Sequence, residues 1–341
     1  MARVQVIATL VEGNSIRATS RLCRVDKDAV MKLGVIVGLG CLALHDRLIR
    51  GVRMATGEVD EVWAFVGRHE KRKRPTDPAE WGDNYTFFAI DAVSKIVPAY
   101  FTGRRDLNDA TAFMVDLRKR VVGKPQLSVD GWIHWPEAVR RGFGSRGCDL
   151  GLVSKEYQNE PDHDDPVRRY TPGRVKWMEK RAILGSPDMD TTSTSIAERL
   201  NLTSRMGQRR ITRLTNAYSK KRENLRAAVA LHFAHYNLVR VHETLGTPPA
   251  VAAGIVAAPW SIAELVRAAL DAAKAPPVAD PAPVASPMNP DAPLPTWGTW
   301  RPMEQLQLVS VDPDPEPLPG DADEDPPTDR DPVPWGVESG G

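Results

Sequence analysis

The sequence predicts a mixed α/β protein with a helical region before the sheet and a disordered tail after it. Apolar residues with helical spacing fill the first 50 positions, and β-rich runs alternate with helical ones from residue 58 to 157. The end of the chain, residues 275–341, holds seventeen of the 29 prolines. With 341 residues, 42% of them hydrophobic, the chain is long enough to bury a substantial core.

Residues 1–52 are predicted to form three short helices separated by turns, with Asp26 as the N-cap of the third. Short helices joined by tight turns favour a helix-turn-helix DNA-binding region, in which the segment after Asp26 is the recognition helix. Lys27 and Lys32 are the candidate DNA contacts on that helix. A plain three-helix packing unit remains the alternative, because no base-reading residue can be identified.

Residues 56–255 are predicted to contain the sheet. Three β-rich runs, VDEVWAFVG, NYTFFAIDAV and KIVPAYFTG, can pair as antiparallel neighbours. A helix over 106–122, a strand PQLSV, a helix near 136–143 and a strand over 148–157 follow. Three strands, a helix, a strand, a helix and a strand are the order of a ribonuclease H-like sheet with flanking helices. In that topology the first and fourth strands are neighbours.

The first strand carries two adjacent acids, Asp60 and Glu61, among Val, Trp and Phe. Successive strand residues point to opposite faces, so we expect only one of the two acids to enter a given site. A buried carboxylate without a counter-charge is costly, and a bound divalent cation compensates for it. Asp130, at the end of the fourth strand, would then lie beside Asp60, although an isolated Asp-Gly is more often a plain turn.

A third carboxylate is expected from a helix that begins near Ser195. Glu198 shares one face of that helix with Asn201 and Arg205, and Arg209 continues the face. This face combines a potential metal ligand with groups that hold phosphates. The alternative is a capping box, in which Ser195 and Glu198 only close the start of the helix.

The charge distribution points to a polyanionic partner. The net charge of +1 is a cancellation, because residues 275–341 contain thirteen Asp and Glu against two Arg, which leaves 43 cations and 31 anions in the rest of the chain. A basic body binds nucleic acid by releasing the counterions condensed on phosphates. The candidate DNA contacts beside the acids are Arg68, Lys71, Arg72, Lys73, Arg74, Asn201, Arg205 and Arg209. A solvated charged surface is the alternative for any one of these clusters.

Three further side chains have simpler interpretations. His232 lies on the apolar stripe of a predicted helix, which favours a core histidine over a metal ligand. Trp63 and Trp132, beside the two aspartates, are predicted to pack around the pocket, with stacking on an extruded base as the alternative.

Several blocks together resemble the DDE transposases of bacterial insertion sequences, in the group related to insertion sequence one. The resemblance covers about residues 57–255 and rests on VDEVWAFVG, AIDAVSKIVPAYFTGRRD, LSVDGWIHWPEAV and the long block from DMDTTSTSIAERL to AVAAGI. It implies a ribonuclease H-like fold and a catalytic, metal-binding triad of Asp60, Asp130 and Glu198. Two departures are evident: the chain lacks the Cys-rich zinc module common in this group, and the acidic tail is unfamiliar.

The resemblance also implies a cofactor, partners and a reaction. Two Mg²⁺ or Mn²⁺ ions would serve metal-dependent DNA cleavage and strand transfer. The expected partners are double-stranded DNA, both element ends and target DNA, and further copies of the chain in the active complex. No membrane partner is expected. A cytoplasmic, nucleoid-associated location is expected. The alternatives are a DNA-binding regulator or inactive domesticated transposase, and a ribonuclease H-like nuclease that cleaves without joining.

Overall fold

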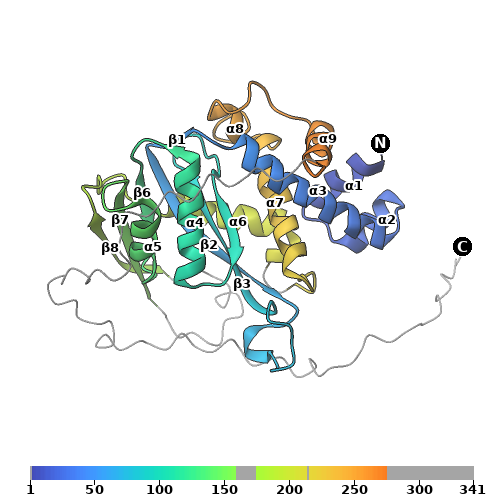
Figure 1. Ribbon diagram of the computed structural model, residues 1–341, viewed down its shortest axis with the longest axis horizontal. Helices are drawn as coiled ribbons and strands as arrows, with labels where there is room; N and C mark the ends of the chain where they lie inside the picture. Colours follow the sequence, from blue (N-terminus) through green and yellow to red (C-terminus); the bar gives the residue numbers. More distant parts are fainter. Residues whose placement is uncertain (1, 159–173, 213–214, 275–341) are drawn as a thin grey trace, which may run out of the picture. The chain divides into compact units, whose positions relative to one another are not determined.

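The computed structural model describes residues 2–158, 174–212 and 215–274. By its internal contacts the chain divides into two units, Met1–Ala279 and Asp280–Gly341, and every described residue belongs to the first. The predicted disordered tail, residues 275–341, lies outside the described residues. Figure 1 shows the described unit as a sheet with helices packed against it, which confirms the mixed α/β class.

The described residues form a six-stranded mixed sheet with the order β4-β3-β2-β6-β7-β8. Its strands are β2 (Thr56–Val66), β3 (Gly82–Asp91), β4 (Tyr100–Gly103), β6 (Gln126–Val129), β7 (Asp149–Gln158) and β8 (Arg174–Leu184). β2 pairs antiparallel with β3 and parallel with β6, and β7 pairs parallel with β6 and antiparallel with β8. The predicted contact between the first and fourth strands, β2 and β6, is therefore confirmed.

Helices cover both faces of the sheet (Figure 1). They are α4 (Leu107–Arg120) and α5 (Trp135–Phe143) on one face, and α6 (Ser195–Gly207) and α7 (Arg222–Leu238) on the other. Phe87 of β3 packs on Phe113 and Trp135 of the first pair, whereas its neighbour Phe88 packs on Phe233 of α7. The alternation of side chains along a strand thus defines two layers of core.

The helical start of the chain consists of α1 (Ala2–Val11), α2 (Ile16–Cys23) and α3 (Lys27–Leu48). The Asp26 side chain accepts hydrogen bonds from the first turn of α3, as its predicted N-cap role requires. Lys27 and Lys32 lie exposed in the first part of this helix. The structure thus leaves both lysines accessible, and their contact with DNA stays a prediction.

The second half of α3 packs against α7 and α9 (Ile262–Ala272). A Cβ on Gly38 would lie 2.2 Å from the Ala227 carbonyl oxygen, and one on Gly40 would lie 2.0 Å from the Ala269 carbonyl oxygen. These glycines allow three helices to approach closely. By length and composition alone α3 could cross a bilayer, but in this structure its apolar side is part of the core.

Several elements differ from the sequence-based expectations or were not anticipated. The third predicted strand begins only at Tyr100, because Pro98 has no N–H to contribute to a ladder. β8 was not predicted, since five of the first eight residues of its sequence RVKWMEKRAIL are charged, as is common in edge strands. The remaining short elements are β1 (Val52–Arg53), η1 (Glu70–Arg72), β5 (Val121–Val122), η3 (Arg209–Ile211) and α8 (Pro249–Ala252).

Candidate metal centre

Asp130 lies directly after the last residue of β6, where the chain turns toward α5. Its Oδ1 accepts hydrogen bonds from the Trp132 backbone N–H at 3.0 Å and from Trp135 Nε1 at 2.9 Å. The parallel ladder between β6 and β2 ends at Glu58 and Ser128, and among the described residues β2 pairs beyond that point only with β3, apart from isolated bridges at Val66. The carboxylate of Asp130 therefore lies beside an open edge of β2.

Asp60 lies on this open part of β2, on the sheet face that α6 covers. Its Oδ1 accepts the Glu61 backbone N–H at 2.8 Å, and its Oδ2 accepts from Asn201 Nδ2 at 2.6 Å. Asn201 belongs to α6 and is buried. Its amide therefore positions the first carboxylate of the site.

Glu61 points to the opposite face of β2, the side of α4 and α5. Its Oε1 accepts from Arg105 Nε at 2.7 Å. Its Oε2 is buried and has no hydrogen-bond partner among the described residues. An arginine thus holds one oxygen of this carboxylate and leaves the other available.

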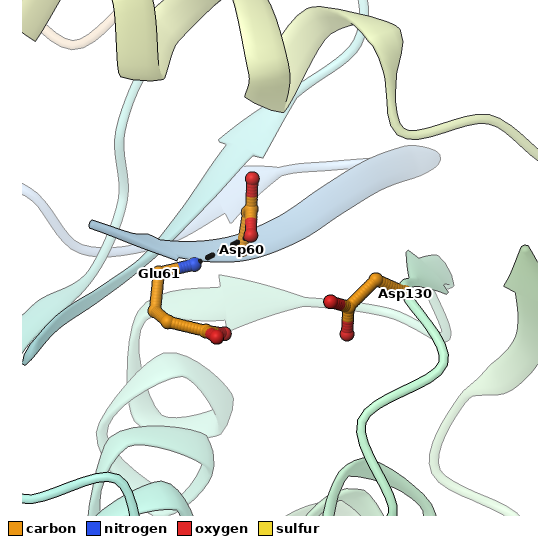
Figure 2. Close-up of side chains that lie close together, drawn as sticks. All are labelled: Asp60, Glu61 and Asp130. Atoms are coloured by element: carbon orange, nitrogen blue, oxygen red, sulfur yellow. Dashed lines mark hydrogen bonds between the residues drawn. The ribbon is translucent and has the colours of Figure 1, made fainter. Parts of the chain in front are cut away.

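The three carboxylates converge despite these different directions. One oxygen each from Asp60, Glu61 and Asp130 lie within 4.8 Å of one another, as Figure 2 illustrates. The expectation that only one of the two adjacent acids enters the site was therefore wrong. β6 ends before it can pair with this part of β2. Both acidic side chains can therefore reach Asp130 around this edge of β2, and Glu61 does so with its longer side chain.

Burial and mutual repulsion oppose ionisation of this group. Burial raises the pKa of Asp60 to about 7, and the charges of Asp130 and Glu198 add to the effect. The pKa of Glu61 is also raised to about 7 by burial, although Arg105 acts in the opposite direction. In the absence of a cation, each of the two side chains therefore gains or loses its proton near neutral pH.

Glu58 attaches α6 to the sheet beside the acids. It is buried on the same face as Asp60, and its Oε2 accepts the Ala197 backbone N–H at 2.8 Å. A carboxylate at the first turn of a helix satisfies a free N–H and interacts favourably with the helix dipole. Two alternate residues of β2, Glu58 and Asp60, thus fix α6 through Ala197 and Asn201. This role of Glu58 was not predicted from the sequence.

Glu198 lies outside the compact group of three. Its Oε1 accepts a hydrogen bond from Thr194 Oγ1 at 2.9 Å and forms an ion pair with Lys155. α6 begins after Thr194 with no side-chain cap, so the alternative of a capping box between Ser195 and Glu198 is not seen. Glu198 is still close enough for its charge to raise the pKa of Asp60.

The predicted DNA-contacting cations occupy two places. Arg68, Lys71, Arg72, Lys73 and Arg74 belong to the connection between β2 and β3, which includes η1. Arg68 forms an ion pair with Asp77 at 3.5 Å, and Lys73 lies 4.0 Å from Glu70. Arg205 of α6 acts electrostatically on Asp60, and Arg209 is exposed in η3. Asn201, predicted to contact DNA, donates its amide to Asp60 instead of presenting it to solvent.

Arg105 was missed by the sequence analysis, and no pattern in the sequence could have identified it. It follows β4, which reaches β2 only through β3, so its contact with Glu61 depends on the sheet order. His232 was placed correctly: it is buried and its Nε2 lies 3.0 Å from Ser204 Oγ. Trp63 and Trp132 are each partly buried among other rings, as predicted for packing residues.

Comparisons with known proteins return distant structural similarities. No protein-family model matches the sequence, and no curated protein matches it. Solved structures of transposases do. The chain is similar to the piggyBac transposase in a synaptic complex with hairpin DNA, with 12% identity, a TM-score of 0.32, and coverage of 80% of this chain and 61% of that one. It is also similar to the Mos1 transposase in a paired-end complex, with 15% identity, a TM-score of 0.19, and coverage of 44% and 57%.

These similarities are too distant to establish function. The chain spans less than two thirds of the piggyBac transposase and of the Mos1 transposase in that complex. TM-scores of 0.32 and 0.19 carry no argument about a shared activity. The proposed chemistry of the site therefore rests on the residues of this chain.

Proposed function

We propose that this chain is a DDE-type transposase that catalyses metal-dependent DNA cleavage and strand transfer. The observation that carries the proposal is the convergence of Asp60, Glu61 and Asp130, whose carboxylate oxygens lie within 4.8 Å of one another at an open strand edge. The strand order β4-β3-β2-β6-β7, with three antiparallel strands followed by two parallel ones, supports the ribonuclease H-like assignment.

The residues present fit a hard divalent cation. All three groups offer carboxylate oxygens, the ligands that Mg²⁺ and Mn²⁺ prefer. The buried Oε2 of Glu61 has no partner within the described part of the chain, and a cation would supply one. We propose that Asp60, Glu61 and Asp130 hold one cation and that Glu198 contributes to a second.

Each residue around the site has a distinct part in the proposed reaction. Bound cations would activate the attacking oxygen and neutralise charge on the phosphate and the leaving 3′ oxygen. Asn201 keeps Asp60 in place, and the Trp132 N–H and Trp135 Nε1 do the same for Asp130. Hydrolysis would first free the 3′ ends of the element, and the same site would then join each 3′ hydroxyl to target DNA.

The partners follow from the reaction and the charge. The body of the chain carries an excess of cations, which favours double-stranded DNA. Transposition requires two element ends to be held together, so the active complex would contain at least two copies of the chain. A cytoplasmic, nucleoid-associated location is part of the same proposal.

The test is an in vitro reaction on a short duplex that carries candidate element ends, with Mg²⁺ present. The parent protein is expected to produce cleaved and joined products, and Asp60→Asn to produce neither. Asp271→Asn is the matched control, because Asp271 is a surface carboxylate of α9 paired only with Lys274 in the described structure.

The outcomes separate the alternatives. Cleavage without joining would favour the ribonuclease H-like nuclease. DNA binding without chemistry would favour the regulator or an inactive relative. Equal activity in the parent and Asp60→Asn would overturn the assignment of Asp60.

A further inference from the structure

Arg105 occupies an unusual position for a cation that pairs with a site carboxylate. It lies between β4 and α4, and its Nε donates to Glu61 Oε1 at 2.7 Å. Its guanidinium carbon lies 4.8 Å from the ring centroid of Trp132 and 5.8 Å from that of Tyr85. One ion pair and two aromatic rings therefore fix the guanidinium group at the edge of the acid cluster.

The two Nη nitrogens of this guanidinium are without a partner in the described part of the chain. Neither Nη nitrogen of Arg105 has a hydrogen-bond partner among the residues the structure describes, and 36% of its side chain is exposed. By contrast, the adjacent Arg104 donates to the backbone oxygens of Asp83, Ala79 and Trp81. Arg104 serves the fold, whereas the partly exposed Arg105 keeps two N–H-bearing nitrogens without a partner in the described structure, next to the acids.

We propose that Arg105 is a catalytic residue that contacts the phosphate undergoing reaction, through its Nη nitrogens. This inference rests on the proposed function. A guanidinium binds phosphate oxygens through two parallel N–H bonds, which a lysine cannot reproduce. Its position beside Glu61 brings that fork to the phosphate that the cation site would hold. The guanidinium of Arg105 would thus stabilise the negative charge that develops on the phosphate, and it would need no reorganisation to do so.

A purely structural ion pair is the competing explanation, in which Arg105 only balances the buried charge of Glu61. The Nε contact alone would serve that purpose. It would not require two aromatic rings to orient the guanidinium, nor would it require both Nη nitrogens to remain without a partner among the described residues. The two explanations differ in whether DNA gains affinity from Arg105 when no cation is present.

The experiment compares Arg105→Lys and Arg105→Ala with the parent and with Arg141→Lys. Arg141 is a matched control, because its Nε donates to Glu137 Oε1 at 2.8 Å with 48% of the side chain exposed, on α5 and outside the acid cluster. Circular dichroism melts verify that each variant is folded. Binding of a fluorescent duplex is measured in EDTA over a series of salt concentrations. Mn²⁺ binding is measured by calorimetry. The kcat and KM of cleavage are measured over a series of Mn²⁺ concentrations.

Arg105→Ala is expected to weaken metal-free duplex binding and to reduce the slope of log affinity against log salt by about 1. Arg105→Lys is expected to lower kcat by about 10²- to 10³-fold, with no recovery at higher Mn²⁺ concentration. Arg141→Lys should match the parent in every measurement.

The proposal would be overturned if Arg105→Ala bound the duplex as the parent does without metal and if high Mn²⁺ restored the rate of Arg105→Lys. Arg105 would then be a positioning residue for Glu61. Absence of cleavage by the parent would count against the proposed function. The metal-free binding measurement would still decide the proposal for Arg105, since equal salt slopes for Arg105→Ala and the parent would reject it.

Discussion

Single residues determine whether the acid cluster can take a cation. Asp60 has both oxygens engaged by N–H donors, whereas Glu61 keeps one buried oxygen without a partner in the described structure. A buried polar atom in this condition costs about 1–3 kcal/mol. We therefore expect Glu61 to contribute more to cation binding than Glu198, whose Oε1 is already engaged by Thr194 and Lys155.

The first prediction concerns these two glutamates. Glu61→Gln should weaken Mn²⁺ binding by at least about tenfold, because it removes a charged ligand from the group of three. Glu198→Gln should have a smaller effect on the first binding event in calorimetry. Glu243→Gln, an exposed change outside the site, serves as the control. A larger loss in Glu198→Gln than in Glu61→Gln would show that the compact group is not the first cation site.

The second prediction concerns pH. Asp60 and Glu61 have pKa values raised to about 7 in the fold, above their ordinary values of 3.8 and 4.5. Their contribution to stability is therefore complete below about pH 4 and is lost as the pH rises through 7. A cation binds the ionised form and compensates for this loss. Mg²⁺ should accordingly raise the melting temperature more at pH 8 than at pH 5.

Asp60→Asn is the control for this pH effect, since it removes one of the titrating groups. The difference between the two pH values should shrink in the variant. An equal shift by Mg²⁺ at pH 5 and pH 8 in the parent would contradict the assignment of the cation to these carboxylates.

At the scale of elements, the N-terminal helices are tied to the C-terminal ones through α3. Gly38 faces the backbone of α7 at Ala227, and Gly40 faces the backbone of α9 at Ala269. Neither contact leaves space for a methyl group. The close approach of the three helix backbones thus depends on Gly38 and Gly40, although glycine has a low helix propensity.

The third prediction tests this packing. Gly38→Ala and Gly40→Ala should each lower the free energy of unfolding by about 1–3 kcal/mol, because overpacking against backbone outweighs the gain in helix propensity. Gly34→Ala is the control, since its Cβ would meet only the flexible end of Leu10 at 3.3 Å. Urea unfolding measures all three. Stabilisation by Gly38→Ala or Gly40→Ala would show that α3 does not pack as described.

Elements could be predicted where the local pattern decides the structure. The helix α4 buries Ala110, Phe113, Met114 and Leu117, the face expected from its spacing. Asp130 could be placed because a strand followed by Asp-Gly marks a strand end. The convergence of Glu61 and the contact of Arg105 could not be predicted. Both depend on where β6 stops pairing with β2 and on β3 lying between β2 and β4.

At the scale of the whole molecule, buried histidines make the fold sensitive to acid. Burial lowers the pKa of His45 and His232 to about 3 and that of His235 to about 4. His45 Nε2 lies 3.0 Å from the Pro98 carbonyl oxygen, a contact that joins α3 to the segment before β4. Each of these rings is therefore neutral in the folded protein near neutral pH.

The fourth prediction follows from these rings. An unfolded histidine takes up a proton near pH 6.5, whereas these three do so only at about pH 3–4. Their contribution to stability is present above pH 6.5 and is lost as the pH falls toward 4. His232→Gln should flatten the decline in urea midpoint between pH 6.5 and 4. A variant with the parent's slope would contradict this account of His232.

The proposed cation site can be located in a crystal of the protein soaked in Mn²⁺ and measured at the manganese absorption edge. An anomalous peak bounded by the carboxylates of Asp60, Glu61 and Asp130 is expected. A protein that cleaves DNA with Mn²⁺ but shows no peak between these three residues would contradict it.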